Sequence, residues 1–217
     1  MYYEFLRRGS ENIPIFWGGA EAFNEAEKQQ LMSQRLRSQF SSRTSWEVLK
    51  PIHERFKNKA WEPSILHWMT YLDLNFRLPE LLLMRVDKMS MGTSLEGRVP
   101  FLDHKFVEFA MSIPSSLKTK NGDLKYLLKK AVRGIIPDEL IDRKKQGFGV
   151  PVYEWLFDKL GHKIREDVKE FCNETNFLNF KEIESVTNNW RDHRSWYLLN
   201  LALWWKQFIK QEEPDVL

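Results

Sequence analysis

Residues Leu78 to Pro114 read LPELLLMRVDKMSMGTSLEGRVPFLDHKFVEFAMSIP, and the first part of this stretch decides the fold class. From Pro79 to about Met91 apolar side chains cover most of the helical circumference, which predicts a helix that is buried on several sides. The same helix carries Arg85, Asp87 and Lys88, and charges on a buried helix need partners. The segment therefore predicts a central helix with charged side chains facing a site or an ion network.

The rest of the chain also reads as helix, and no run alternates apolar and polar residues over a length that would allow a strand to be assigned. The sequence thus predicts a mainly α protein, with Asn24 and Glu27 at capping-box spacing and Pro51 inside the second helix. The expected helices span 26–40, 46–57, one from Pro63, one from Pro79, 104–111 behind Asp103, 124–132 behind Asp123, one from Pro137, 151–159 up to Gly161, and 196–210.

The 217 residues are expected to form one helical domain, with an irregular N-terminal segment over 1–23 and a frayed acidic tail over 211–217. The net charge of +3 is too small to indicate nucleic-acid binding. No apolar run approaches the roughly 18 residues of a membrane span, and MYYEFLRRGS is not a signal peptide. The single cysteine, Cys172, fits a reducing compartment and reads as a small buried hydrophobe. These features predict a cytoplasmic protein.

Glu96, Arg98 and Asp103 form the first candidate site, because they fall within eight positions after the apolar helix with apolar residues between them. An arginine in such a loop can hold a carboxylate or a phosphate through two parallel hydrogen bonds. The alternative is that Arg98 pairs with Glu96 or Asp103 in a structural ion network, and spacing alone slightly favours this alternative.

The second candidate is DRKKQGFGVP, from Asp142 to Pro151. Three cations precede Gly147 and Gly149, and glycines allow the backbone to approach a ligand closely. A polyphosphate site and a solvated basic loop are equally compatible with this pattern, which does not match a P-loop. The five histidines are scattered without metal-ligand spacing, so no metal site is predicted.

Two segments in the right order resemble one family. Leu78–Pro114 is similar to the pattern LPxxLLxxxDxxSMxxSLExRxPFLDxxxxEfaxxiP, and Gly122–Leu156 contains the core RxKxGFxxP. Both patterns are typical of glutamine-hydrolysing asparagine synthetases. The resemblance implies the helical C-terminal portion of an adenine nucleotide α-hydrolase-like α/β domain, with the parallel sheet missing from this chain.

Members of that family release ammonia from glutamine in an N-terminal domain that begins with a catalytic cysteine. They then activate aspartate with ATP and Mg²⁺ as β-aspartyl-AMP, and ammonia displaces AMP to give asparagine. This chain has Tyr2 at its second position and contains neither the SGGxDS loop nor the SGxGxDE loop. The resemblance therefore implies an ATP-dependent amide-forming ligase of which this chain is one part, inactive alone and binding neither ATP nor Mg²⁺ firmly. Its expected partners are the missing glutaminase and nucleotide-binding segments or a separate chain carrying them, with aspartate and glutamine as small-molecule substrates and no nucleic acid or membrane.

Carried over residue by residue, the motif makes Lys145 the candidate catalytic residue. Lys145 and Arg143 match the lysine and arginine of RxKxGF, which lie near the ATP phosphates and pyrophosphate in the family. Four residues that match the preceding motif are expected to hold the wall of the site, namely Asp87, Glu96, Arg98 and Asp103.

Two alternative functions stay open. The first is an amidotransferase of the same family that acts on another carboxylate, such as a surface-sugar or peptide precursor. The second is a non-catalytic helical interaction module. In either case a missing sheet would leave the apolar face from Leu81 to Met89 uncovered.

Overall fold

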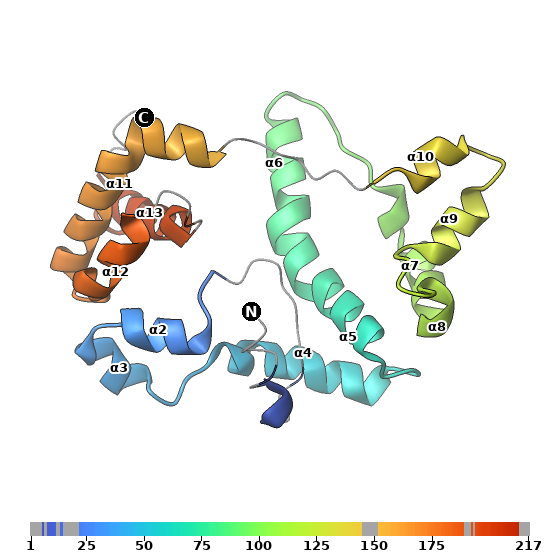
Figure 1. Cartoon of the computed structure of the whole chain (residues 1–217), viewed down its shortest axis with the longest axis horizontal. Helices are drawn as coiled ribbons and strands as arrows, with labels where there is room; N and C mark the ends of the chain where they lie inside the picture. The colour runs from blue at the N-terminus through green and yellow to red at the C-terminus, as the bar shows by residue number, and fades with distance from the viewer. Residues whose placement is uncertain are drawn as a thin grey trace. The chain divides into compact units, whose positions relative to one another are not determined.

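The computed structural model describes residues 6, 8–11, 14, 22–144, 152–188, 192 and 194–212, with few side chains described between 152 and 159. The mainly α class is confirmed, because helices occupy most of these residues and β pairing among them is limited to isolated bridges (Figure 1). The chain divides into two compact units, which are described separately. Unit 1 comprises Met1–Gly19 and Trp46–Gln146, and unit 2 comprises Ala20–Ser45 and Gly147–Leu217.

Unit 2 begins with the expected capping box, which is confirmed. The Glu27 N–H donates to Asn24 Oδ1 (2.9 Å) and the Asn24 N–H donates to Glu27 Oε2 (2.8 Å). The single helix expected over 26–40 is wrong, because α2 (Glu25–Leu31) and α3 (Gln34–Phe40) are separated at Met32 and Ser33. The backbone there turns aside to pair with a distant segment: the Ser33 N–H donates to the Phe177 carbonyl at 2.9 Å.

The core of unit 2 lies between α11 (Val152–Thr175), α12 (Phe180–Thr187) and α13 (Arg194–Trp204) (Figure 1). The expected break at Gly161 is wrong, since α11 continues through it for 24 residues. Ile164, Val168, Phe171 and Cys172 fall at helical spacing and are all buried. Their burial outweighs the cost of a helical glycine, which is about 1 kcal/mol.

Cys172 is buried as expected, and burial raises the pKa of its thiol to about 11. The expected last helix is also present: α13 continues into the π-helical segment η3 (Trp205–Ile209). Lys206 of η3 donates to Asp167 Oδ1 (2.9 Å) and Glu170 Oε2 (2.6 Å) of α11. Burial by itself would lower the pKa of Lys206, but hydrogen bonds to these two carboxylates raise this pKa above its usual range. This ion network fixes η3 against α11.

Unit 1 contains α4 (Ser45–Lys59), followed by a continuous helical run made of α5 (Ile65–Leu72), η1 (Asp73–Leu83) and α6 (Met84–Met91) (Figure 1). Pro63 is not a first-turn proline, because the Ser64 hydroxyl caps α5 by accepting from the His67 N–H at 3.3 Å. Pro79 does not open a helix either; it lies inside η1, whose turns are π-helical. A widened turn is one way in which a helix accommodates a residue without an N–H.

The remaining elements of unit 1 are short: η2 (Pro100–Leu102), α7 (His104–Ser112), α8 (Ser115–Lys118), α9 (Tyr126–Val132) and α10 (Asp138–Asp142). The Asp103 cap is confirmed, since Asp103 Oδ1 accepts from the backbone of Lys105 and Phe106 at 3.0 and 3.2 Å. The Asp123 cap is wrong. Lys125, with φ of +61°, precedes α9 instead, and Asp123 accepts from Lys129 Nζ.

The prediction that the helix from Pro79 to Met91 is buried on several sides is also wrong. No residue of η1 or α6 is buried, and Met89 is 77% exposed. The buried cluster of unit 1 lies on α4 and α5 and consists of Leu49, Phe56, Trp68 and Leu72. The helical run therefore extends past the core that its own unit supplies, and most of its apolar side chains from Leu82 onward are exposed, Leu83 being half-buried.

A polar cluster joins the start of α5 to α8. The Glu62 carboxylate accepts from the Ser115 N–H (2.9 Å) and from the Ser115 hydroxyl (2.5 Å). Beside it, the fully buried His67 ring lies 3.1 Å from the carbonyl oxygens of Glu62 and Ile113. The cluster satisfies polar groups at two chain turns and so holds α8 against α5.

We expect the Glu62 contacts to make unit 1 less stable in acid. Hydrogen bonds from the Ser115 side chain and backbone lower the pKa of Glu62 below its ordinary 4.5. A carboxyl with a lowered folded-state pKa stabilises the fold above its unfolded pKa, and this contribution is lost as pH falls. The protection factors of the α8 amides, which are taken relative to the intrinsic exchange rate at each pH, should therefore fall below about pH 4.5 in the parent and change less with pH in Glu62→Gln. An equal pH dependence in both proteins would contradict this role.

Candidate functional site

The loop after α6 contains most of the expected site-wall residues. Arg98 Nη2 lies 2.8 Å from Glu96 Oε1, and the two side chains are 81% and 68% exposed. The ion pair between Arg98 and Glu96, the alternative favoured by spacing, is therefore present. Asp103 does not join this pair, because its carboxylate caps α7. A pair so exposed holds its members weakly, so both remain accessible to a ligand.

Asp87, the fourth expected wall residue, is exposed on α6. The Glu96–Arg98 loop packs close to this helix, since a Cβ added at Gly97 would lie 3.4 Å from Val86 Cγ1. The structure thus brings the loop that carries Glu96 and Arg98 beside the helix that carries Asp87. A methyl group at position 97 would therefore be in ordinary van der Waals contact with α6.

The basic segment begins where α10 ends. Arg143 is the C-terminal cap residue of α10, and Arg143 and Lys144 are both exposed. Lys145, Gly147 and Gly149 lie outside the described residues, so the assignment of Lys145 stays a prediction. The structure does describe the residues that precede this segment, from α9 to Lys144.

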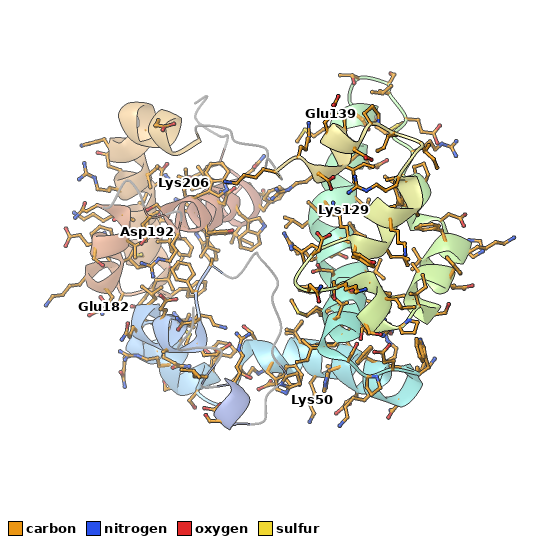
Figure 2. All side chains as sticks on the ribbon, turned by 45° about the vertical axis from the view of Figure 1, so that its right-hand side comes forward. Lys50, Lys129, Glu139, Glu182, Asp192 and Lys206 are labelled. Carbon is orange, nitrogen blue, oxygen red and sulfur yellow. The ribbon has the colours of Figure 1, made fainter. Side chains whose placement is uncertain are left out.

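An ion bridge that the residue spacing did not predict joins the end of α9 to α10. Arg133, at the end of α9, lies between the first and last residues of α10: its Nη1 is 3.0 Å from Asp138 Oδ1 and its Nη2 is 2.6 Å from Asp142 Oδ1. Figure 2 shows the side chains of these two helices around Lys129 and Glu139. The sequence feature that corresponds to this bridge is the position of Asp138 and Asp142, five and nine residues after Arg133. The intervening turn contains Gly134 at φ of +78°.

Unit 1 also contains a mostly apolar pocket of about 630 Å³ between α4, the α5–η1 run and α7. Its lining includes Phe56, Tyr71, Leu78 and Met111, together with the polar side chains His67 and Glu62. Among the expected site residues that the structure describes, none lines this pocket. Among the described residues no group of three or more acidic, histidine or cysteine side chains could hold a metal ion, and no described helix has the length and apolarity to cross a bilayer.

Apolar side chains are exposed on α6 and in the loop that follows. We expect this surface to bind a hydrophobic dye when the 217-residue chain is studied alone, because large contiguous apolar patches are rare on monomeric proteins. Replacing Val86 and Met89 by glutamine should lower dye fluorescence and any self-association seen by light scattering. Absence of dye binding by the parent chain would contradict the expectation. The exposed members on α6 and after it are Met84, Val86, Met89, Met91, Leu95, Val99 and Phe101, and Leu82 at the end of η1 is also exposed.

Known proteins resemble this chain over most of its length. A model of the family described as asparagine synthase matches residues 4–206. Asparagine synthetase (glutamine-hydrolyzing) 1 of Bacillus subtilis is 36% identical over 153 residues, which cover 70% of this chain and 23% of that protein. Asparagine synthetase (glutamine-hydrolyzing) 3 of the same organism is 49% identical over 67 residues, 31% of this chain and 11% of that protein. Amidase chyE of Penicillium rubens is 32% identical over 136 residues, 59% of this chain and 20% of that protein.

No solved structure matches the chain. The chain spans about a quarter of the length of the curated relatives that it matches. The family model nevertheless covers almost all of the chain. The described parts of the motifs that carry the resemblance lie on η1, α6, α7 and the residues between them, and on α9, α10 and the start of α11. The chain belongs to the asparagine synthase family.

Proposed function

We propose that this chain forms the helical C-terminal part of the synthetase domain of a glutamine-hydrolysing asparagine synthetase. In that reaction ATP activates the β-carboxylate of aspartate as an adenylate, with release of pyrophosphate, and ammonia from glutamine then displaces AMP. The observation that carries the proposal is the match of residues 4–206 to the family, together with relatives named as glutamine-hydrolyzing asparagine synthetases. The cytoplasm, where the buried Cys172 would stay reduced, is the proposed location.

Lys145 is the proposed catalytic cation, with Arg143 beside it. Adenylate formation increases negative charge on the α-phosphate and on the leaving pyrophosphate, and a fixed ammonium stabilises that charge. Support comes from the sequence position of Lys145, three residues after the last residue of α10 and directly after the exposed cations Arg143 and Lys144. Asp87, Glu96, Arg98 and Asp103 are proposed to hold the wall of the site. We assign no ligand of Mg²⁺ to this chain.

The rest of the enzyme is the proposed partner of the exposed apolar face on α6. The face carries Met84, Val86 and Met89, which are 43–77% exposed. Such an area is typical of a surface that another part of a protein covers. We propose that the glutaminase and nucleotide-binding segments, in the same polypeptide or in a separate chain, cover it.

An acceptor other than aspartate is the second candidate function. It is favoured by the similarity of residues in this chain to a protein named amidase chyE. The fold that binds the phosphates would be the same, and only the groups that recognise the acceptor carboxylate would differ. None of the residues assigned above distinguishes the two acceptors.

The test is ATP–pyrophosphate exchange by the complete enzyme that contains this chain. Exchange that depends on aspartate supports asparagine synthesis, and exchange that requires another carboxylate supports the second candidate. No exchange with any carboxylate would overturn both and leave the non-catalytic module. The isolated 217 residues should show no exchange, because they contain neither SGGxDS nor SGxGxDE; activity of the isolated chain would contradict the proposed dependence on partner segments.

A further inference from the structure

The pocket in unit 1 has the size of a small-molecule site. Its volume is about 630 Å³, within the range of roughly 300–1,000 Å³ that is usual for ligand pockets. Most of its lining is apolar, and the rings of Phe56 and Tyr71 pack against each other there with centroids 5.5 Å apart. The lining therefore favours a ligand with an apolar group to bury.

Several polar side chains of the lining are already engaged within unit 1. The Glu62 carboxylate accepts two hydrogen bonds from Ser115. The Asn75 amide donates to the Tyr71 carbonyl at 2.8 Å, and both ring nitrogens of His67 lie 3.1 Å from backbone carbonyl oxygens. These groups complete the local structure, so recognition of a ligand has to come from other lining residues.

Lys59 and Glu108 are the lining charges that remain available. Lys59 is the last residue of α4 and Glu108 lies in α7, and both side chains are exposed. Neither forms an ion pair or a hydrogen bond with any residue that the structure describes. Two helices thus bring one positive and one negative group to the same apolar pocket, where the two do not pair with each other.

A ligand that matches this arrangement carries a carboxylate, an ammonium and an apolar group. An α-amino acid with an aliphatic or aromatic side chain has all three, and its two charged groups are attached to one carbon. Its carboxylate can accept from the Lys59 ammonium while its own ammonium donates to Glu108. Its side chain would then be buried among apolar lining residues such as Leu78 and Val107.

We propose that this pocket binds a free α-amino acid with an apolar side chain, held between Lys59 and Glu108. The inference goes beyond the proposed function, because it concerns a ligand and a set of residues to which that function assigns no role. The ligand would contact η1 through Leu78, and η1 continues directly into α6.

A less specific pocket is the competing explanation. In that case Lys59 and Glu108 are solvated surface charges, and the pocket accepts any apolar molecule or an apolar side chain of another protein segment. The two explanations differ in the importance of charge. An amino-acid site loses affinity when either charge is removed from the ligand or from the protein, whereas an unspecific apolar pocket does not.

The experiment titrates the 217-residue chain, labelled with carbon-13 in its methionine methyl groups, with free L-phenylalanine and follows the binding by NMR. The methyl signal of Met111, which lines the pocket, should shift and saturate with a Kd of about 1 mM, as expected for a ligand of this size. The signal of Met89 should not shift, because Met89 is exposed on α6 and is not a lining residue. Met89 thus controls for binding to the exposed apolar face.

Two analogues and two variants test the charges separately. Phenethylamine lacks the carboxylate and hydrocinnamate lacks the ammonium, and each should bind about three- to five-fold more weakly than L-phenylalanine. Lys59→Gln should weaken binding of L-phenylalanine and hydrocinnamate by a similar factor but leave phenethylamine unaffected, and Glu108→Gln should do the reverse. Lys50→Gln is a matched control, because it removes an exposed α4 cation paired with Glu54 and should change no affinity.

Three results would overturn the inference. They are the absence of a saturable shift of Met111, an equal shift of Met89, and equal affinities for the three compounds in the parent and in both variants. Each would leave the proposed function intact, since the titration measures binding without any reaction. Failure of the proposed function is recognised separately, by the absence of ATP–pyrophosphate exchange in the complete enzyme, and would not affect this site.

Discussion

Replacing Lys145 by alanine in the complete enzyme is expected to slow ATP–pyrophosphate exchange by about 100-fold or more while glutamine hydrolysis continues unchanged. The expected loss is large because a preorganised cation acts on charge that increases in the transition state, whereas a solvated surface lysine does not. Steady-state rates of exchange and of glutamate release, measured on the same preparation, separate the two half-reactions.

Lys144 provides the matched control for this experiment. It is the adjacent lysine, it is exposed, and the motif RxKxGF assigns it no role. Lys144→Ala should reduce exchange by no more than about three-fold, since it removes one unit of nearby charge without a positioned contact. Unchanged asparagine synthesis in Lys145→Ala, or an equal loss in both variants, would refute a specific role for Lys145.

Replacing Phe171 by alanine is expected to destabilise unit 2 by about 3–5 kcal/mol, the largest effect on stability anticipated in this chain. Phe171 is 2% exposed and lies in the cluster formed by α11, α12 and α13. Its ring packs edge-on against Phe177 (centroids 6.2 Å apart) and Trp205 (6.0 Å), and these two rings also pack edge-on against each other. Truncation would leave a cavity and remove two aromatic contacts at once.

Amide hydrogen exchange with mass-spectrometric readout suits this test because it reports on unit 2 separately from unit 1. Protection of the α11 amides should fall by two orders of magnitude or more in Phe171→Ala, which corresponds to the expected free-energy change. Phe208→Ala is the matched control, because Phe208 of η3 is 63% exposed and its truncation leaves no buried cavity. Similar loss of protection in both variants would show that Phe171 is not central to the core.

The sequence predicted features that depend on neighbouring residues. The Asn24–Glu27 capping box and the Asp103 cap are both present, because a side-chain oxygen bonds an N–H two or three residues away. The predictions from sequence were wrong where packing between distant residues competes with the local conformational preference. Gly161 continues a helix because the stripe around Val168 is buried, and the break at Ser33 exists because its backbone pairs with Phe177. Pro79 lies inside a long helical run because the π-helical turns of η1 accommodate it.

The candidate site also contains features that the sequence predicted and features that it did not. Arg98 pairs with Glu96, one of the outcomes that the sequence predicts, because the two residues are two positions apart. The bridge from Arg133 to Asp138 and Asp142 could not be assigned from spacing, since it depends on how the turn at Gly134 folds α10 back toward α9. The burial expected for the helix from Pro79 to Met91 was wrong because apolar periodicity shows that a face requires a partner and does not show whether the partner is in the same chain.

The sequence by itself determined that this protein is mainly α, that α2 and α7 begin behind the capping residues Asn24 and Asp103, and that its motifs resemble those of the asparagine synthase family. These properties depend on local hydrogen bonding, helical periodicity and motif order, which are written along the chain. Only the tertiary structure decided that the chain forms two compact units, that the apolar residues of α6 are exposed, and that Arg133 holds the carboxylate preceding the cationic segment. Those properties depend on contacts between residues separated in sequence, and such contacts are selected by the packing of whole helices.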